Sequence, residues 1–212
     1  MNLWIKGHFL FAALVVSCSA VMLDECGPLI KPLSMDRPDV MYGRSNFLVG
    51  YSDSKIFNDI MNITLSAWLN ISASPDGEGG LVLTEENNMN GTCIGSTMNL
   101  TIENDVARGA FADLQSGFQL LPTCEGCLLF TINSTSKNIK KVLEVFKINT
   151  SVEDSEFQAR SLYLLSRETT VTDADIEKLK KQASCLGFVG EPNFVYNPDH
   201  GFCKEGEGIR LQ

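Results

Sequence analysis

Two closely spaced cysteines are the residues of this sequence that come nearest to a reactive site. Cys124 and Cys127 form a Cys-x-x-Cys pattern, which provides a reactive dithiol in redox enzymes. A catalytic pair of this kind normally opens a helix, whose N-terminus lowers the thiol pKa. Here the pair lies beside a predicted strand. We therefore interpret it as a short structural bridge, or as two cysteines with other partners, rather than as a redox site.

Other side chains that support catalysis at neutral pH are scarce. His8 lies in a predicted leader, which leaves His200, in a Pro-Asp-His-Gly turn, for the rest of the chain. Zinc and haem sites need clustered histidines or free cysteines, and the sequence contains no nucleophile elbow or phosphate-binding glycine loop. Carboxylates are plentiful, but their spacing singles out no acid pair. We expect no catalytic residue, no metal and no cofactor, and a protein that is not an enzyme.

The first 20 residues have the features of a secretory signal peptide. Lys6 provides positive charge, Phe9–Val16 is an apolar run, and residues 17–20 are small enough for cleavage. The run is far shorter than the roughly 20 residues of a membrane-spanning helix. We predict a signal peptide at 1–20 and one secreted, extracellular domain at 21–212 that does not insert into membranes. A bacterial lipoprotein site at Cys18 is the alternative, and the glycosylation pattern argues against it.

Asparagine triplets and cysteines both indicate an extracellular protein. Chance would give roughly two Asn-x-Ser/Thr triplets in a chain of this composition, whereas this one has six, at Asn62, Asn70, Asn90, Asn99, Asn133 and Asn149. We expect these asparagines on the surface, where a glycan must lie. An even number of cysteines in a secreted chain indicates a set of disulfides, and six remain after the leader: Cys26, Cys93, Cys124, Cys127, Cys185 and Cys203.

The charge of the chain excludes one class of partner. Seventeen basic and 26 acidic residues give a formal net charge of −9 at pH 7, and loss of Lys6 with the leader makes the mature chain more negative still. Such a surface repels nucleic acids and anionic membranes. We therefore expect no nucleic-acid partner. A mature length of roughly 190 residues suits one domain with a substantial core.

The middle of the chain consists of segments that alternate between apolar and polar residues, as strands do. In one of them, residues 63, 65, 67, 69 and 71 are apolar, while Asn62 and Asn70 lie on the polar face. The eight predicted strands favour a closed antiparallel up-and-down barrel, with an immunoglobulin-like sandwich as the alternative. They are Gly43–Tyr51, Ile60–Ser72, Leu81–Glu85, Cys93–Ile102, Ala107–Leu114, Cys127–Asn133, Lys141–Asn149 and Arg160–Arg167.

One helix is expected after the strands, at about 173–184. Thr172 is a favourable N-cap, and acidic residues follow it at the positive end of the helix dipole. Ile176, Leu179 and Ala183 share one face, and Gly187 is a suitable stop. The fold class expected is therefore all-β with one C-terminal α-helix. Residues 186–212 form a tail that a disulfide at Cys203 must hold.

Several segments then carry a resemblance to a known family. They are Cys26-Gly27-Pro28-Leu29, the strand that opens at Gly43, Leu164-Leu165-Ser166-Arg167 at the end of the last strand, Cys185-Leu186 after the helix, and Asn193-Phe194-Val195-Tyr196 before Cys203. Their order resembles the lipocalins, in the α1-acid glycoprotein branch. Within that branch the chain is most similar to the fish plasma proteins that bind saxitoxin, tetrodotoxin or tributyltin.

The resemblance implies particular roles for some of these residues. It implies disulfides Cys26–Cys185 and Cys93–Cys203, which leaves Cys124 and Cys127 as a third pair. It also implies a barrel base built on Gly43 and Arg167. Lipocalins place a tryptophan two residues after this glycine, where it closes the barrel beneath the arginine. Here that position is Ser45, and Phe47 on the same face could substitute in part.

A barrel with apolar inward side chains can hold a small hydrophobic or amphipathic ligand. By alternation, the side chains expected to line the cavity are Phe47, Val49, Tyr51, Leu65, Leu69, Ile94, Met98, Phe130, Phe146 and Tyr163. We expect a monomeric carrier or scavenger of such a ligand, and the resemblance implies a toxin or xenobiotic. The alternative is an extracellular protein-interaction or immune-modulating glycoprotein that uses the barrel only as a scaffold.

Overall fold

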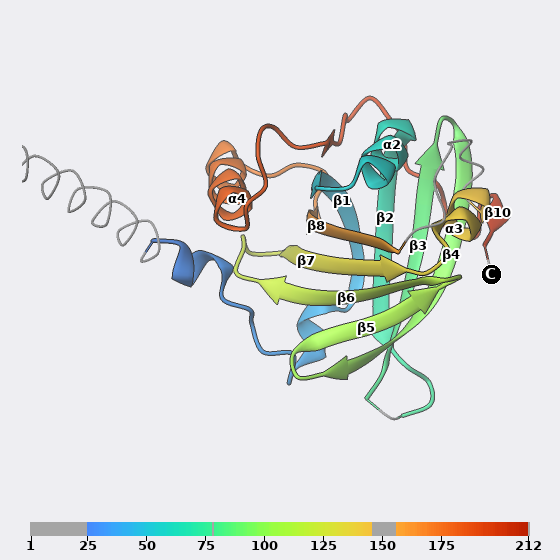
Figure 1. Ribbon diagram of the computed structural model, residues 1–212, viewed down its shortest axis with the longest axis horizontal. Helices are drawn as coiled ribbons and strands as arrows, with labels where there is room; N and C mark the ends of the chain where they lie inside the picture. Colours follow the sequence, from blue (N-terminus) through green and yellow to red (C-terminus); the bar gives the residue numbers. More distant parts are fainter. Residues whose placement is uncertain (1–24, 78, 146–155, 212) are drawn as a thin grey trace, which may run out of the picture.

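The computed structural model describes residues 25–77, 79–145 and 156–211, and the predicted signal peptide lies outside these ranges. Eight strands form one closed antiparallel barrel, in which each strand pairs with its neighbours in sequence and β8 returns to β1 (Figure 1). The predicted barrel is thereby confirmed. The strands are β1 (Gly43–Ser52), β2 (Thr64–Ala73), β3 (Leu81–Met89), β4 (Thr92–Glu103), β5 (Val106–Phe111), β6 (Leu114–Leu121), β7 (Cys127–Ser136) and β8 (Phe157–Ser166).

The eight strands are not all the ones predicted. The predicted strand Lys141–Asn149 is wrong, because a helix, α3 (Ile139–Val145), occupies most of it and the remainder lies outside the described residues. Ile139, Val142 and Leu143 are buried at helical spacing. In turn, β6 was not predicted. The first residue of β6 was instead assigned to the preceding predicted strand. The sharp turn between the two strands, at Ala112 with φ of 50°, contains neither glycine nor proline and so gave no turn signal.

The predicted strand Ile60–Ser72 begins too early. Its first four residues are the end of α2 (Lys55–Ile63), a helix that joins β1 to β2. Ser54 caps this helix by accepting a hydrogen bond from the Phe57 amide. The apolar residues of Ile60–Ser72 fit the spacing of a strand as well as that of a helix end, so alternation alone could not locate the boundary.

The C-terminal helix α4 (Asp173–Cys185) confirms the prediction at both ends. Thr172 Oγ1 accepts a hydrogen bond from the Asp175 amide, and the Asp175 carboxylate accepts one from the Thr172 amide, which completes a capping box. Leu179 and Ala183 are buried against the outer wall of the barrel. Gly187 has a φ of +84°, which a glycine adopts without strain. None of the described helices is long and apolar enough to cross a membrane.

Two groups of buried side chains lie on opposite sides of the barrel wall, one filling the interior and one beneath α4. Val49 and Tyr51 belong to the group beneath α4, so their predicted inward orientation is wrong. The β1–β8 register shifts between Phe47 and Val49. Such a bulge adds one residue and reverses which side chains face inward beyond it. Gly50 faces inward instead, because a Cβ there would meet the side chains of Phe47 and Met61.

The tail after α4 is held along the outer wall and returns towards β4 (Figure 1). A disulfide joins Cys203 to Cys93 of β4, and β10 (Ile209–Arg210) pairs with the same strand. Trp68 is covered by the tail, and its indole N–H donates to the Cys203 carbonyl over 2.7 Å. The buried Glu86 carboxylate pairs with Arg210 at 3.1 Å. The tail is therefore part of the packed structure.

A two-residue strand in the tail, β9 (Phe194–Val195), completes the barrel wall near α2. β1 pairs with β2 only over residues 43–46, and further along it pairs with β9 through Val49 and Gly50. Phe194 thereby joins the interior group and stacks on Phe47. The wall is thus closed, where β1 and β2 separate, by residues that come after the helix.

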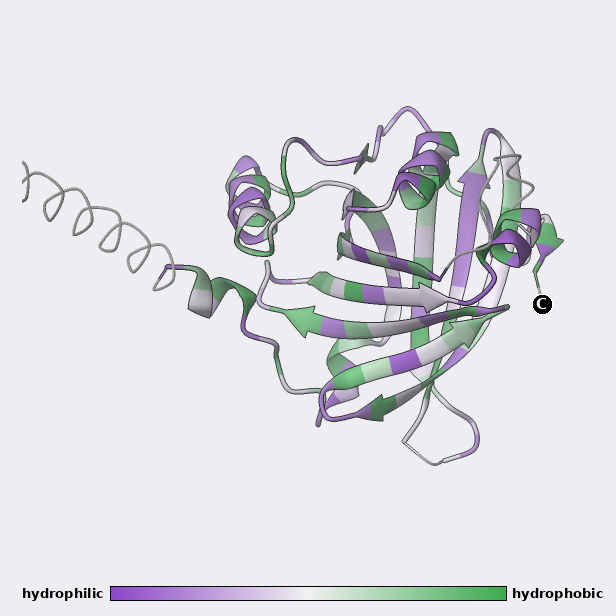
Figure 2. Ribbon diagram, viewed as in Figure 1, coloured by the Kyte–Doolittle hydropathy of each residue, from purple (hydrophilic) through white to green (hydrophobic). Residues whose placement is uncertain are grey.

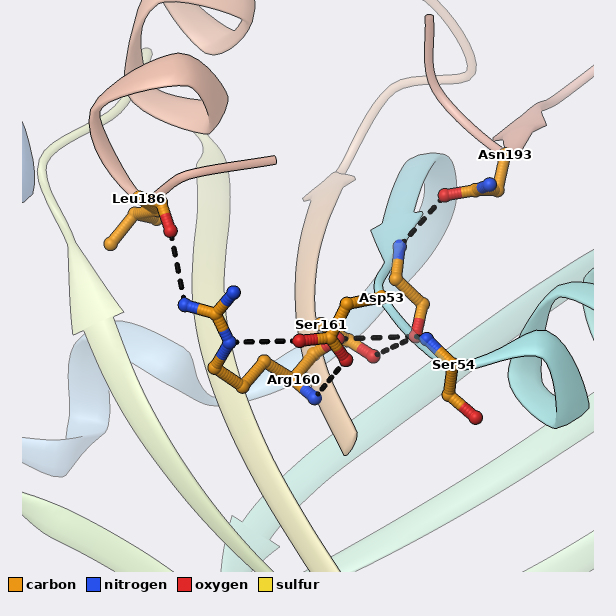
Figure 3. Close-up of polar contacts among 7 residues, drawn as sticks. Asp53, Ser54, Arg160, Ser161, Leu186 and Asn193 are labelled. Carbon is orange, nitrogen blue, oxygen red and sulfur yellow. Dashed lines mark hydrogen bonds and ion pairs between the residues drawn. The ribbon is translucent and has the colours of Figure 1, made fainter. Parts of the chain in front are cut away.

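A polar network fixes this tail to the end of the barrel near α2 (Figure 3). The Asp53 carboxylate accepts hydrogen bonds from the backbone N–H and from Nε of Arg160, at 2.7 and 2.8 Å. Arg160 Nη1 also donates to the carbonyl of Leu186, just after α4. Asn193 accepts a hydrogen bond from the Ser52 amide at 2.8 Å. The β1 and β8 ends, the α4 C-terminus and β9 are therefore tied together.

At the opposite end, Arg167 closes the base together with η1 (Pro38–Met41). Its guanidinium donates to the carbonyls of Tyr42 and Arg44. Gly43 has a φ of +93°, and a Cβ at this position would lie 3.0 Å from Arg167 Nη1, so the close approach requires glycine. Ser45 is fully buried. Met41 of η1 fills the base where the resemblance implies a tryptophan, and Phe47 lies nearer to α2.

Candidate ligand-binding site

The interior of the barrel contains two adjacent hollows of about 100 Å³ each, which together form the lobes of one interior cavity region. The deeper lobe reaches Met41 at the base, and the upper lobe lies beneath Met61 of α2. The two lobes share four lining residues: Leu69, Glu85, Tyr163 and Leu165. An apolar cavity of about 150 Å³ is large enough for one aromatic ring. Each lobe, at about 100 Å³, is smaller than that and suits a short alkyl chain.

Glu85 and Tyr163 are the two titratable groups among the described lining residues. Burial raises the pKa of the Glu85 carboxyl, and hydrogen bonds from the Asn87 and Ser96 side chains oppose that rise. Burial, together with a smaller effect of the nearby Glu85 charge, raises the pKa of Tyr163 to about 12 against the opposing effect of a hydrogen bond with Ser161. Both side chains are partly buried. Both line the interior cavity, so their accessible surface borders that cavity.

Glu85 faces inward because of its place in β3. Its cross-strand neighbours are Leu69 on β2 and Ser96 on β4. Leu81 and Leu83 precede it at alternate positions and line the same cavity. Figure 2 shows the second half of β3 as a hydrophilic stretch. Glu85 was not predicted to line the cavity, although its alternation with Leu81 and Leu83 was a signal that could have identified it.

The structure brings together half of the residues predicted to line the cavity: Phe47, Leu69, Met98, Phe130 and Tyr163. Val49 and Tyr51 lie on the other side of the wall. Leu65 lies next to a register shift in β2, and Ile94 is buried, but neither borders the two lobes. Phe146 lies outside the described residues.

The remaining predicted residues lie away from the cavity. The three disulfides are Cys26–Cys185, Cys93–Cys203 and Cys124–Cys127, so within the described chain no free thiol is available at the Cys-x-x-Cys turn. His200 lies in a turn of the tail, where its carbonyl accepts a hydrogen bond from the Tyr196 hydroxyl. The triplet asparagines that the structure describes lie outside the barrel interior, with Asn62, Asn90, Asn99 and Asn133 exposed and Asn70 half-buried.

Two larger hollows lie at the surface. One, of about 340 Å³, borders the Cys124–Cys127 turn and Arg167, and the other, of about 500 Å³, borders β5, β7 and β8. Both are open to solvent. A ligand held there would keep much of its surface in water, whereas binding sites bury most of a small ligand. The interior cavity is therefore the better candidate site.

Comparison with known proteins identifies the fold. No family model matches the chain, and no curated protein sequence does. Solved structures do match, among them the siderocalin Ex-FABP, described as functioning through dual ligand specificities, with a TM-score of 0.55, 15% identity, and coverage of 74% of this chain and 95% of that one. The fold is that of a lipocalin.

Two further lipocalin structures support this assignment. The bovine lipocalin allergen Bos d 2 gives a TM-score of 0.52 at 17% identity, covering 73% of this chain and 90% of that one. The odorant-binding protein OBP1 gives 0.51 at 11% identity, with 74% and 89% covered. At these identities the similarity concerns the fold alone. In this barrel, Glu85 and Tyr163 border the interior cavity.

Proposed function

We propose that this protein is a secreted, N-glycosylated lipocalin that carries or sequesters a small hydrophobic or amphipathic ligand in its barrel. The enclosed two-lobed cavity supports this proposal most directly, because apolar side chains surround one carboxyl and one phenol. Apolar walls provide roughly 25 cal/mol per Å² of ligand surface removed from water, and the few polar groups orient the ligand. The cavity favours this function over the scaffold alternative.

Secretion and glycosylation are supported by the chemistry of the chain. All six cysteines that follow the predicted leader form disulfides, which persist in oxidising compartments. The described triplet asparagines lie outside the barrel interior, where glycans do not obstruct the core. The resemblance noted in the sequence adds saxitoxin, tetrodotoxin and tributyltin as candidate ligands. We expect the carrier to be a monomer.

Displacement of a neutral fluorescent probe tests the proposed function. N-phenyl-1-naphthylamine is titrated into the mature chain 21–212, and tributyltin, saxitoxin, tetrodotoxin, fatty alcohols and steroids are then added as competitors. We expect saturable probe binding with one site, and displacement by at least one candidate. Absence of saturable binding by the probe and by every candidate would overturn the proposal and leave the scaffold alternative.

A matched pair of variants tests whether the probe binds inside the cavity. Ala107 is buried and lines the deeper lobe, whereas Ala110 is exposed on the same strand. Ala107→Leu fills part of the lobe and should weaken probe binding, and Ala110→Leu should leave it unchanged. Equal binding by both variants and the wild type would place the ligand outside the cavity.

A further inference from the structure

The Cys124–Cys127 disulfide differs from the other two bridges in what it holds together. Its cysteines are three positions apart, whereas the other two bridges join segments 110 and 159 residues apart. Chain entropy makes a long bridge the larger contributor to stability. Reduction of Cys124–Cys127 should therefore leave the fold intact, while reduction of either long bridge weakens it.

Hydrogen bonds already hold the turn that this bridge closes. The Cys127 amide donates to the Cys124 carbonyl at 3.2 Å, and the Arg167 amide donates to the Gly126 carbonyl at 3.1 Å. The two strands that flank the turn, β6 and β7, pair directly with each other. The turn thus keeps its shape whether the two sulfurs are joined or separate, and a purely structural role does not account for the bridge.

Both cysteines of the bridge line a hollow at the base of the barrel. The hollow has a volume of about 340 Å³, is open to solvent and also borders the exposed side chains of Leu33 and Val40. It is too open to hold a small ligand by burial alone. A thiol that reacts with the bridge, however, has only to reach a sulfur atom. The half-buried Cys124 and Cys127 are accessible to such a thiol from the hollow.

The surroundings of the two sulfurs differ. The Thr123 hydroxyl lies 3.6 Å from Cys124 Sγ, and it must be the donor because a disulfide sulfur carries no proton. Lys178 Nζ donates to the Thr123 carbonyl at 3.4 Å, which places an ammonium group near Cys124. Cys127 Sγ instead faces the Glu125 carbonyl oxygen at 3.7 Å. Donors and cations lower a thiol pKa, and the thiol of lower pKa leaves faster. Cys124 is therefore the leaving sulfur.

The charge of the hollow favours one kind of thiol. Among the described residues that line it, Arg167 is the one charged side chain. A Cβ at Gly126 would lie 3.9 Å from Arg167 Cγ, so this side chain runs beside the turn. Glu125 is exposed in the same turn and does not line the hollow. A carboxylate on an incoming thiol is therefore attracted to the hollow.

We propose that Cys124–Cys127 is a thiol–disulfide exchange site for small thiols that carry a carboxylate. The incoming thiolate attacks Cys127 Sγ, the bond between the two cysteine sulfurs breaks, and its electron pair leaves on Cys124 Sγ, which takes a proton from water. A second thiolate then attacks the sulfur of the first, which releases the small disulfide and leaves Cys127 as a thiol. Two thiols are thereby oxidised, and the bridge gains two electrons. The site is separate from the interior cavity and its ligand.

Reduction of the native protein by glutathione tests the inference. The mature chain is incubated with excess reduced glutathione without denaturant, free thiols are blocked with iodoacetamide, and the labelled positions are found by peptide mass spectrometry. We expect label on Cys124 and Cys127, while the other four cysteines stay bridged and the far-UV circular dichroism is unchanged. Absence of label, or equal labelling of the half-buried Cys26 and Cys185, would overturn the inference.

The Thr123 hydroxyl provides a test of the order of attack. Thr123→Val keeps the shape and should slow opening of the bridge about tenfold, because a hydrogen bond to a charged group is lost. Thr97→Val, at an exposed position on β4, is the matched control and should open at the wild-type rate. Acid quenching at early times should find glutathione attached to Cys127. A wild-type rate in Thr123→Val, or attachment to Cys124, would refute the assignment of Cys124 as the leaving sulfur.

Two thiols that differ in their head group test the preference for a carboxylate. Rates of opening by 3-mercaptopropionate and 2-mercaptoethanol are compared per thiolate present. An exposed ion pair with Arg167 should make 3-mercaptopropionate about two- to fivefold faster, and high salt should remove the difference. Equal rates at low salt, or a faster neutral thiol, would overturn the proposed class of substrate. A difference that persists at high salt would refute the role of the Arg167 charge.

Discussion

Phe194 stacks on Phe47 with ring centroids 4.5 Å apart and planes within 7° of parallel. The contact joins the first barrel strand to a residue near the C-terminus, at the place where β1 no longer pairs with β2. Phe47 also contacts Tyr163, which lines the cavity. The tail therefore packs against a residue of the cavity wall, so we expect its packing to affect both stability and ligand binding.

Removal of the Phe194 ring should destabilise the barrel and loosen the cavity. Phe194 is buried, and Phe→Ala changes in cores cost about 3–5 kcal/mol. We expect Phe194→Ala to lower the free energy of unfolding in urea by this amount and to weaken probe binding. Phe202, which stacks on Tyr196 in the half-exposed tail, is the control, and Phe202→Ala should cost about 1 kcal/mol. Similar effects of the two changes would show that β9 does not close the wall.

Ser45 and Ser66 give a pair of buried hydroxyls with opposite expectations. Ser45 Oγ is without a hydrogen-bond partner among the described residues, whereas Ser66 Oγ donates to the Gly201 carbonyl at 2.7 Å. An unsatisfied buried hydroxyl is destabilising. Ser45→Ala should therefore raise the free energy of unfolding by about 1 kcal/mol, and Ser66→Ala should lower it by about 1 kcal/mol. Loss of stability in Ser45→Ala would indicate a partner for this hydroxyl.

Much of the fold was predictable from the sequence, because local signals determine it. Alternation located most strands, and the Thr172 cap and Gly187 marked the ends of α4. The β1 bulge was not predictable, since it depends on the register with β8 and leaves no residue signature. It reversed the orientation of Val49 and Tyr51. The short apolar run of α3 has both strand and helix spacing, and only tertiary packing distinguishes the two.

The site was predictable in part for the same reason. Apolar residues away from the register shifts, such as Leu69 and Met98, face the cavity as alternation implied. Glu85 followed the same alternation, but a charged residue at an inward position contradicts the usual preference for apolar side chains. Its role depends on what surrounds it in three dimensions. The pairing of Glu86 with the tail, which distinguishes the two adjacent carboxylates, spans more than a hundred residues and has no local signal.

The disulfides should differ in their contributions to stability. Cys93–Cys203 spans 110 residues and Cys124–Cys127 spans three. Chain entropy predicts a loss of about 5 kcal/mol without the long bridge and about 2 kcal/mol without the short one. We expect the double serine variant of the long pair to unfold at much lower urea concentration than that of the short pair. The opposite order would show that strain or unfolded-state structure outweighs loop entropy here.

The Asp53–Arg160 contact should stabilise the barrel end more than an isolated surface ion pair does. Arg160 also bonds the Leu186 carbonyl, so the pair links β8 to the C-terminus of α4. Both side chains are partly exposed, which reduces the gain, and we expect Asp53→Ala to cost about 1–2 kcal/mol. Lys55–Asp59, an exposed pair within α2, is the control, and Lys55→Ala should cost less than about 0.5 kcal/mol. Equal costs would mean that the network adds nothing to the pair.

The ionisation of Glu85 should lower the free energy of unfolding as pH rises, whereas the ionisation of most carboxyls raises it. Its pKa is raised on folding above the unfolded value of about 4.3. The folded state therefore binds more protons than the unfolded state between the two pKa values, and the free energy of unfolding falls as pH rises through this range.

Glu85→Gln cannot ionise, so it should be more stable than the wild type at neutral pH, with a difference that vanishes below about pH 4. Urea unfolding of both proteins across this range isolates the effect, because contributions from other carboxyls cancel in the difference. Glu103→Gln should show no such trend, since the Glu103 side chain is exposed. A wild type more stable than Glu85→Gln at neutral pH would show that the protein already compensates the Glu85 charge.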